Sequence, residues 1–364
     1  MRLKEIINVI EQLAPSSYQE SYDNSGLITG NTEMEITGAL ICLDSLEIIL
    51  DEAIEKKCNL IIAHHPIVFT GLKRLNGNNY IERVIIKAIK NDIAIYAVHT
   101  NLDNVYDGVN SKICEKLNLI NCKILSPKSH QLRKLVTYAQ KKDAEGIRNA
   151  LFKSGAGEIG NYSECSFTTT GIGTYKGNDE SNPTVGAKNI TSFEPEERIE
   201  VIFSKHLEGQ IITTIKSNNT YEEVAYEIYE ISNDNQFIGA GMVGELPNAM
   251  NPNEFLQFVK IKMNASCVRF TKPLLEPIKK VAVCGGSGSF LLEHAVKSGA
   301  QVFISADFKY HQFFDAESKI MILDIGHFET EQFTIELLGA YLSEKFPKFA
   351  VHLTELNTNP INYI

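Results

Sequence analysis

The chain has 364 residues, of which 43% are hydrophobic and 22% charged, and its net charge is −10. This composition is typical of globular proteins, and the length is sufficient for two or three domains with apolar cores. The net negative charge argues against a function in binding nucleic acid or anionic membrane surfaces. We therefore expect neither nucleic acid nor a membrane as a partner.

The seven cysteines are scattered and include no C-x-x-C pair. That pattern argues against a disulfide framework and against a zinc ribbon. No apolar run is long enough to span a bilayer, and the first residues combine charges with helical apolar spacing. We expect a soluble, cytoplasmic protein.

Both ends of the chain alternate apolar strands with helices, which is typical of a mostly parallel sheet covered on both faces. The N-terminal third predicts helices over 3–13, 45–57 and 80–90 and strands over 38–43, 59–65 and 93–98. The C-terminal third predicts strands over 279–284, 301–305, 319–324 and 351–356 and helices over 290–298 and 328–346.

The middle of the chain has a different order of elements. Strands are predicted over 134–139, 163–175, 198–203 and 222–231, with helices over 143–154 and 205–217. This β-α-β-β-α-β order is the ferredoxin-like signature. We predict an inserted α+β domain over residues 128–234, within a two-lobed α/β domain built from 1–127 and 235–364.

Candidate ligands for metal ions follow three of the predicted strands. These residues are His64 and His65, then Asp103 together with His99, and then His327. In parallel sheets, side chains from distant positions converge beyond the carboxyl ends of the strands. Glu331 lies four residues after His327, so a helix would present both side chains on one face to a common cation.

Five ligands exceed what one open tetrahedral zinc site needs, whereas two ions bridged by Asp103 or Glu331 would use them all. Imidazoles and carboxylates suit zinc first, with iron or manganese as alternatives. Two observations favour a structural role instead. A single histidine at a strand end is usually a structural residue that forms hydrogen bonds within the fold. In addition, the side chains of His64 and His65 would point to opposite sides of a regular strand unless the chain twists at Pro66.

Several motifs together make the chain resemble the NGG-one-interacting-factor-three-like family, whose members are often called GTP cyclohydrolase I type 2 homologs. They are Tyr22–Leu27, Ala63–Pro66, His99–Asp103, Cys284–Gly288, Asp307–His311 and Gly326–Glu331. The resemblance implies that His64, His65, Asp103, His327 and Glu331 bind two divalent metal ions. It also implies a homohexamer and an insert similar to the PII/CutA signalling proteins. This sequence departs from the family at Tyr22, often Trp, and at Ala306, usually Gly.

The resulting hypothesis is a metal-dependent hydrolase that acts on a nucleotide-like molecule. The family label implies that water attacks the imidazole carbon of GTP and opens the ring, with His99 transferring protons. Gly285–Gly288 predicts either a phosphate cradle or a tight turn, and His311 is a weaker candidate than His99. The alternative hypothesis is a non-catalytic metal-binding, metal-delivery or regulatory protein whose PII-like insert senses a ligand.

Overall fold

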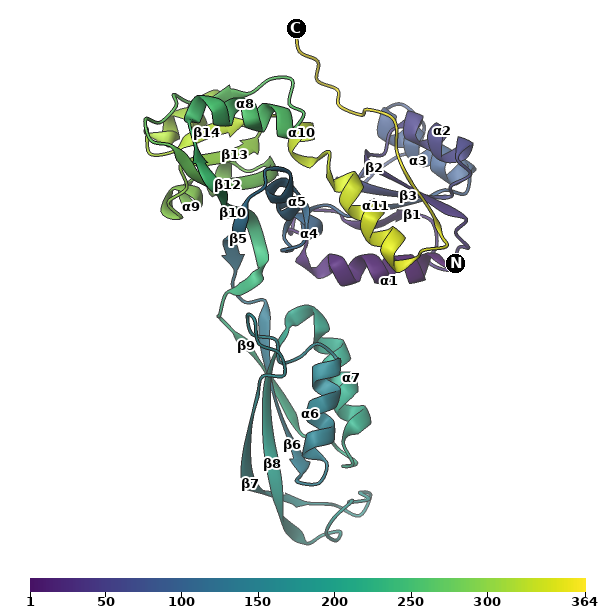
Figure 1. Ribbon diagram of the computed structural model, residues 1–364. Helices are drawn as coiled ribbons and strands as arrows, with labels where there is room; N and C mark the ends of the chain where they lie inside the picture. Colours follow the sequence, from purple (N-terminus) through teal and green to yellow (C-terminus); the bar gives the residue numbers. More distant parts are fainter. The chain divides into compact units, whose positions relative to one another are not determined.

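The protein folds into two compact units, which a computed structural model describes over all residues, 1–364 (Figure 1). One unit combines Met1–Pro127 with Phe237–Ile364, and the other is Lys128–Gln236. None of the helices combines the length and the apolar character that crossing a membrane requires.

The first sheet of the larger unit has the strand order β1-β4-β3-β2-β15. Its strands are β1 (Gly26–Thr29), β2 (Gly38–Asp44), β3 (Leu60–His65), β4 (Ala94–Ala97) and β15 (Ala350–Leu353). The last four are parallel, and β1 is antiparallel to β4. The central strands are apolar up to their polar last residues, because helices cover both of their faces.

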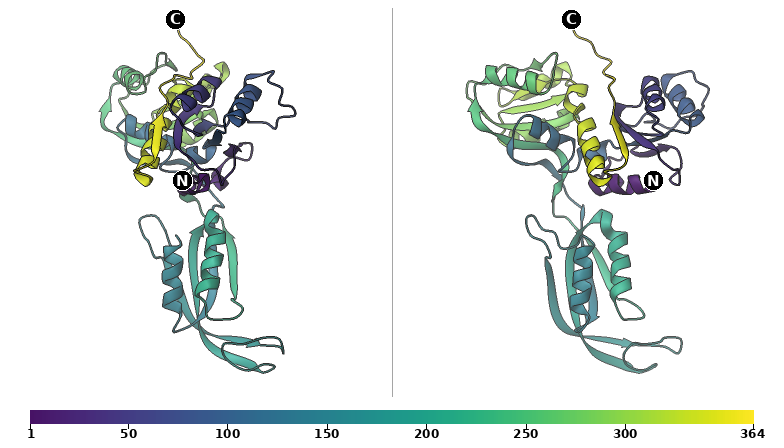
Figure 2. Two further views of the ribbon diagram at one scale, coloured as in Figure 1. Left: turned by 90° about the vertical axis from the view of Figure 1, so that its right-hand side faces the viewer. Right: turned by 45° about the vertical axis from the view of Figure 1, so that its right-hand side comes forward.

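Helices lie on both faces of this sheet (Figures 1 and 2). Alternate residues of its strands pack with two different helical layers. Ile41 and Ile62 pack with the layer formed by α1 (Leu3–Leu13) and α11 (Thr334–Lys345). Leu40 and Ile61 pack with the layer formed by α2 (Glu47–Glu55) and α3 (Tyr80–Lys90). The period of two along each strand thus produces one buried core on each side of the sheet.

The second sheet of this unit has the order β11-β14-β13-β12-β10-β5. Its strands are β5 (Ile120–Lys128), β10 (Asn235–Met250), β11 (Arg269–Phe270), β12 (Ile278–Ser287), β13 (Val302–Ala306) and β14 (Met321–Asp324). β12, β13 and β14 are parallel. One face packs with α5 (Val109–Lys116) and α8 (Pro252–Lys262), in a core continuous with that under α1 and α11. The other face packs with α9 (Leu292–Lys297).

Short helical segments lie at several strand ends. They are η1 (Ser16–Tyr18), α4 (Thr100–Asp103), η3 (Ser289–Leu291), η4 (Tyr310–Ala316) and α10 (His327–Glu331). Two of them, α4 and α10, carry residues of the candidate site.

The smaller unit has the order β-α-β-β-α-β. Its elements are β6 (Leu132–Gln140), α6 (Ala144–Lys153), β7 (Ser166–Lys176), β8 (Thr191–Ser204), η2 (Lys205–Leu207), α7 (Glu208–Asn218) and β9 (Tyr226–Ile231). The sheet order is β7-β8-β6-β9, and its strand pairs are antiparallel. Both helices pack on one face, against a core that includes Leu135 and Ile199. The likeness to PII/CutA proteins stays a prediction.

Three predicted elements differ from the structure. The helix expected over 328–346 is two helices, α10 and α11, which are separated at Gln332 and the buried Phe333. The strand expected from 222 begins at Tyr226, since the Glu222 carboxylate instead accepts from Asn182 N. The predicted turn at 285–288 is largely strand, because β12 continues to Ser287.

Candidate metal centre

The five predicted ligands come from both sheets of the larger unit. His64 and His65 end β3, and Asp103 ends α4, which follows β4. His327 and Glu331 are the first and last residues of α10, which follows β14 in the second sheet. The carboxyl ends of parallel strands therefore carry the whole set, as the strand patterns predict.

The carboxylate of Glu331 lies at the centre of this group. Its Oε2 is 2.9 Å from Nε2 of His65 and 3.2 Å from Nε2 of His327. Its Oε1 is 3.8 Å from Nε2 of His64, and that nitrogen is 3.7 Å from Oδ1 of Asp103. The two oxygens of one carboxylate thus face two different sets of ligand atoms.

His64 and His65 are adjacent in the chain, yet their side chains reach the same site. Their ring centroids are 4.9 Å apart, with 50° between the ring planes. Their Nε2 atoms lie near opposite oxygens of Glu331. The end of β3 is therefore twisted, which is the condition that the sequence set for both to act as ligands.

Four of the ligand atoms are buried and lack a hydrogen-bond partner. They are Nε2 of His64, Nε2 of His65, Oδ1 of Asp103 and Oε2 of Glu331. Some of these atoms are close together, but none is aligned as a hydrogen bond. Buried polar atoms are nearly always satisfied, and the nitrogen and carboxylate donors here suit divalent cations. His64, His65 and Glu331 alone offer ligand atoms within 4.8 Å of one another.

The other ring nitrogen of each ligand histidine is held by an acceptor. Nδ1 of His64 bonds to the backbone O of Val98 at 2.8 Å. Nδ1 of His65 bonds to Asp44 at 2.8 Å, and Nδ1 of His327 bonds to Asp307 at 2.7 Å. Such contacts fix ring orientation and direct Nε2 toward a metal.

Asp44 and Asp307 were missed as orienting residues by the sequence analysis. Each occupies a strand end, since Asp44 ends β2 and Asp307 follows β13. An acidic residue at that position is the signal that could have identified them.

The pKa values of the three ligand histidines are shifted in different directions. Burial lowers the pKa of His64. Burial also lowers the pKa of His65, but the hydrogen bond to Asp44 and the nearby carboxylate of Glu331 outweigh it and raise the pKa to about 10. For His327, the charge of Glu331 similarly outweighs burial and raises the pKa to about 11. Since metal binding requires neutral imidazoles, a cation must compete with protons at the last two rings.

The two carboxylates of the site shift in opposite directions. Burial raises the pKa of Glu331, but His327 and His64 outweigh it and hold the pKa well below its usual range. Burial and then the negative charge of Glu331 raise the pKa of Asp103 well above its usual range. A positive ion between Glu331 and Asp103 would reduce the electrostatic repulsion between their carboxylates.

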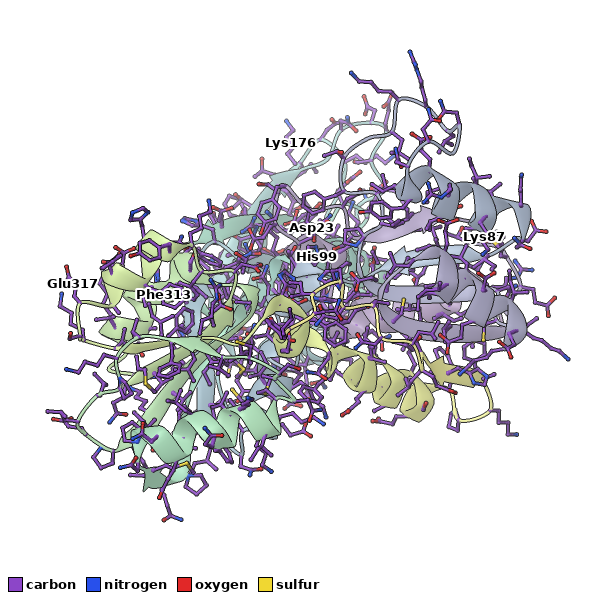
Figure 3. All side chains as sticks on the ribbon, turned by 90° about the horizontal axis from the view of Figure 1, so that it is seen from above. Asp23, Lys87, His99, Lys176, Phe313 and Glu317 are labelled. Carbon is purple, nitrogen blue, oxygen red and sulfur yellow. The ribbon has the colours of Figure 1, made fainter.

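His99 lies beside the metal ligands and forms a pair with Asp23 (Figure 3). Its ring centroid is 5.4 Å from those of both His64 and His65. Its Nδ1 bonds to Oδ1 of Asp23 at 2.7 Å. Oδ2 of Asp23 accepts from Thr100 N at 3.0 Å, which fixes the carboxylate.

Hydrogen bonds, led by that to His99, outweigh burial and hold the pKa of Asp23 well below its usual range. The sequence analysis identified His99 but missed Asp23, although the residue stands in the Tyr22–Leu27 motif.

The glycine-rich segment does not form a phosphate cradle. Gly285 N donates to Asn110 Oδ1 at 2.9 Å, and Gly286 N donates to Thr330 Oγ1 at 2.9 Å. Gly286 has φ +59°, and a Cβ atom there would collide with Oε1 of Glu331. The segment instead allows the backbone of β12 to approach the metal ligands closely.

His311 does not join the metal ligands. It is exposed within η4, and its ring contacts those of Tyr310 and Phe314.

Two exposed aromatic rings lie next to His99. Tyr22 is 64% exposed and Phe69 is 47% exposed, and their ring centroids are 6.3 Å apart. The ring of Phe69 is also 6.3 Å from that of His99. Asn24 Nδ2 donates to Val68 O at 2.6 Å, which ties the two segments together. Exposed aromatic faces beside polar groups are a common form of ligand site.

Known proteins resemble the chain over its full length. The family model for Duf34/NIF3 (NGG1p interacting factor 3) matches residues 1–360. The GTP cyclohydrolase 1 type 2 homolog of Bacillus subtilis (strain 168) is 37% identical, over 99% of this chain and 98% of that protein. The homolog from Halalkalibacterium halodurans is 35% identical, over 99% of this chain and 98% of that protein.

Solved structures share the fold as well. A Bacillus cereus protein related to NIF3 is 34% identical, with a TM-score of 0.88 over 100% of this chain and 99% of that one. Staphylococcus aureus protein SA1388 is 30% identical, with a TM-score of 0.78 over 100% of this chain and 99% of that one. Sequence, motifs and fold agree, and the chain belongs to the Duf34/NIF3 family.

Proposed function

We propose that this protein is a metal-dependent hydrolase that acts on a nucleotide-like substrate. The observation that carries the proposal is the set of four buried ligand atoms without hydrogen-bond partners around the shared carboxylate of Glu331. A purely structural cluster would leave these atoms desolvated and unpaired, which is costly. Two cations would satisfy them.

Each cation position has its own ligands in this proposal. His65, His327 and Oε2 of Glu331 would hold one ion, and His64, Asp103 and Oε1 of Glu331 would hold the other. Zinc suits this donor set first, and iron or manganese are alternatives. When bound, divalent cations supply Lewis acidity and make water more acidic.

His99 is the residue that would move protons. Asp23 holds Nδ1, so Nε2 is left to accept or donate a proton at the substrate. A histidine is suited to this because its ring carries two nitrogens, one of which can be held by a partner while the other exchanges a proton. The ring contacts with His64 and His65 place His99 beside two of the residues that would hold the metal ions.

The substrate class rests on two further observations. Curated relatives are named GTP cyclohydrolase 1 type 2 homologs, and Tyr22 and Phe69 offer exposed ring faces next to His99. A purine ring could stack on such faces while its reactive carbon approached the metal ligands. GTP is therefore the first substrate to test.

The experiment is incubation of zinc-, iron- or manganese-loaded protein with GTP, with formate release and ring opening as readouts. We expect turnover that a His65→Ala variant lacks. Phosphodiesters and phosphomonoesters are tested beside GTP. Turnover equal to that of the variant on every substrate contradicts the hydrolase, whereas turnover on another substrate class contradicts only GTP.

The second candidate function is metal delivery, and the exposure of one ligand favours it. The His327 side chain is 37% exposed and its partner Asp307 is 48% exposed, so one cation position is open to solvent. An open position permits rapid exchange of the ion. Transfer of zinc to a chelator within seconds, without turnover of any substrate, would favour delivery over hydrolysis.

A further inference from the structure

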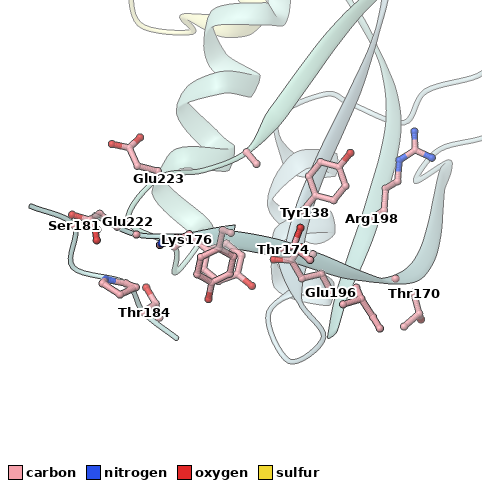
Figure 4. A pocket seen from close by; sticks show the side chains of 18 of the residues that line it. Tyr138, Thr170, Thr174, Lys176, Ser181, Thr184, Glu196, Arg198, Glu222 and Glu223 are labelled. Carbon is pink, nitrogen blue, oxygen red and sulfur yellow. The ribbon is translucent and has the colours of Figure 1, made fainter. Parts of the chain in front are cut away.

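The smaller unit contains a cavity that the metal centre does not involve. Its volume is about 600 Å³, and it lies among β7, β8, the loop between them and the segment after α7 (Figure 4). The lining residues that matter here are Tyr138, Gly171, Gly173, Tyr175, Glu196 and Tyr221. All of them belong to Lys128–Gln236.

Two glycines form the floor of the cavity. Gly171 is paired with Glu196 across the β7–β8 ladder, so both face the same side of the sheet. A Cβ atom on Gly171 would have nothing within 4 Å, whereas one on Gly173 would collide with the Glu196 carboxylate. The missing side chains leave open space and let the carboxylate lie over the strand.

The walls of the cavity are tied together by hydrogen bonds. Thr184 Oγ1 donates to Thr220 O at 2.8 Å, and Asn182 N donates to Glu222 Oε2 at 2.6 Å. Tyr175 donates its hydroxyl to Val185 O at 2.8 Å. The loop after β7 is thereby held against the segment after α7, which keeps the cavity open in one shape.

The charge inside the cavity is unbalanced. Glu196 forms no ion pair, whereas the nearby Arg198 is paired with Glu200 at 2.6 Å. Lys176 also lines the cavity, but this residue is exposed to solvent. The hydroxyl of Tyr221 is buried and lacks a hydrogen-bond partner. Burial, and then the nearby Glu196 carboxylate, raise the pKa of Tyr221, so the cavity contains a carboxylate without an ion-pair partner beside a buried hydroxyl.

We propose that this cavity binds a small organic cation that carries N–H donors, an alkylammonium or a guanidinium compound. The Glu196 carboxylate would accept charge-assisted hydrogen bonds from it. Tyr138, Tyr175 and Tyr221 would contact the cation with ring faces and hydroxyls. An anion would meet Glu196 unfavourably, and an apolar ligand would leave that carboxylate desolvated.

The test is calorimetric titration of the full chain with agmatine, which has both a guanidinium and an ammonium group. We expect saturable binding with one site per chain, and weaker binding of tetramethylammonium, which has no N–H donors. Glu196→Gln should weaken agmatine binding at least tenfold. Glu227→Gln, an exposed carboxylate on β9, is the matched control and should bind like the unmodified protein.

A second variant separates binding from folding. Gly171→Leu fills open space without a contact to the backbone, so it should keep the melting temperature while abolishing agmatine binding. Binding that survives both Gly171→Leu and Glu196→Gln overturns the proposal, and so does the absence of saturable binding at millimolar agmatine. Concentration-dependent self-association that Gly171→Leu abolishes also overturns it, because a second copy would then be the occupant.

Discussion

Nε2 of His65 lies 2.9 Å from Oε2 of Glu331, although His65 ends β3 of the first sheet and Glu331 ends α10, which follows β14 of the second sheet. Both atoms are buried. Because the second oxygen of Glu331 faces His64, one carboxylate serves both proposed cation positions. Loss of that carboxylate should therefore affect both ions together.

Glu331→Gln should reduce bound metal from two ions per chain to fewer than one. The amide keeps the shape of the side chain but removes the charge that balances two cations. Elemental analysis after dialysis measures the ratio. Glu329→Gln is the control, since that buried carboxylate lies in the same helix outside the ligand group. Equal metal content in the two variants would refute a shared bridging role.

Asp44→Asn should weaken metal binding by about 10- to 100-fold, the usual effect of removing a residue that orients a ligand. The asparagine can still accept from Nδ1 of His65, but it lacks the charge that makes the imidazole a better donor. Competition with a chelating dye measures the affinity. Asp51→Asn, an exposed carboxylate paired with Lys87, should leave the affinity unchanged.

Gly286→Ala should abolish metal binding, whereas Gly299→Ala should not. Both glycines have positive φ, +59° and +77°, so both alanines carry a backbone strain of about 1–2 kcal/mol. Only the alanine at 286 would also collide with Glu331, because a Cβ at 299 has open space around it. Melting temperature and metal content separate the two effects. Retained metal in Gly286→Ala would show that Glu331 can move without losing its ligand role.

His99→Gln should lower turnover by about 100- to 10,000-fold, the range typical of general acid–base groups, and should leave both metal ions bound. Asp23→Asn should also lower turnover, because an amide no longer fixes which nitrogen of His99 carries the proton. Single-turnover rates and metal content are measured on the same samples. Loss of metal in His99→Gln would assign the residue to the ligand set instead.

Glu52→Gln should destabilise the protein by about 1–2 kcal/mol at pH 7 and not at all at low pH. Burial raises the pKa of Glu52, but bonds from Thr354, Glu355 N and Lys56 outweigh it and lower the pKa. A carboxyl group whose pKa is lower in the folded state than in the unfolded state stabilises the fold at pH values above its unfolded pKa. That stabilisation is lost as the pH falls through the folded-state pKa.

Denaturant unfolding at a series of pH values measures the effect of Glu52→Gln. Glu55→Gln is the matched control, since Glu55 is exposed on the same helix. A difference between Glu52→Gln and the unmodified protein that did not change with pH would contradict this account.

The parts of the fold and site that could be predicted are those marked by a pattern among residues close together in the sequence. Apolar runs bounded by polar residues marked β2, β3 and β14, and the i,i+4 spacing of His327 and Glu331 marked one face of α10. The long strands β5 and β10 have no such pattern, since β10 mixes glycines and exposed residues with buried ones.

Contacts between distant residues explain what the sequence could not supply. Asp23, Asp44 and Asp307 gain their roles only from the histidines that lie opposite them in space. The amide partners Asn110 and Thr330 likewise decide that the Gly285–Gly286 segment is not a phosphate cradle. No local spacing encodes these pairings, because each joins residues from different strand ends or helices that are far apart in the sequence.

The pairing of β15 with β2 also orders events during synthesis. His352 is in register with Leu40, so the first sheet acquires its edge strand only after residues 350–353 have left the ribosome. Glu331 emerges equally late, whereas Lys128–Gln236 is complete much earlier and makes its own core. A nascent chain therefore holds a folded middle while His64 and His65 wait for their partners. Synthesis of Glu331, rather than of the early strands, therefore sets the earliest moment at which the metal centre can form.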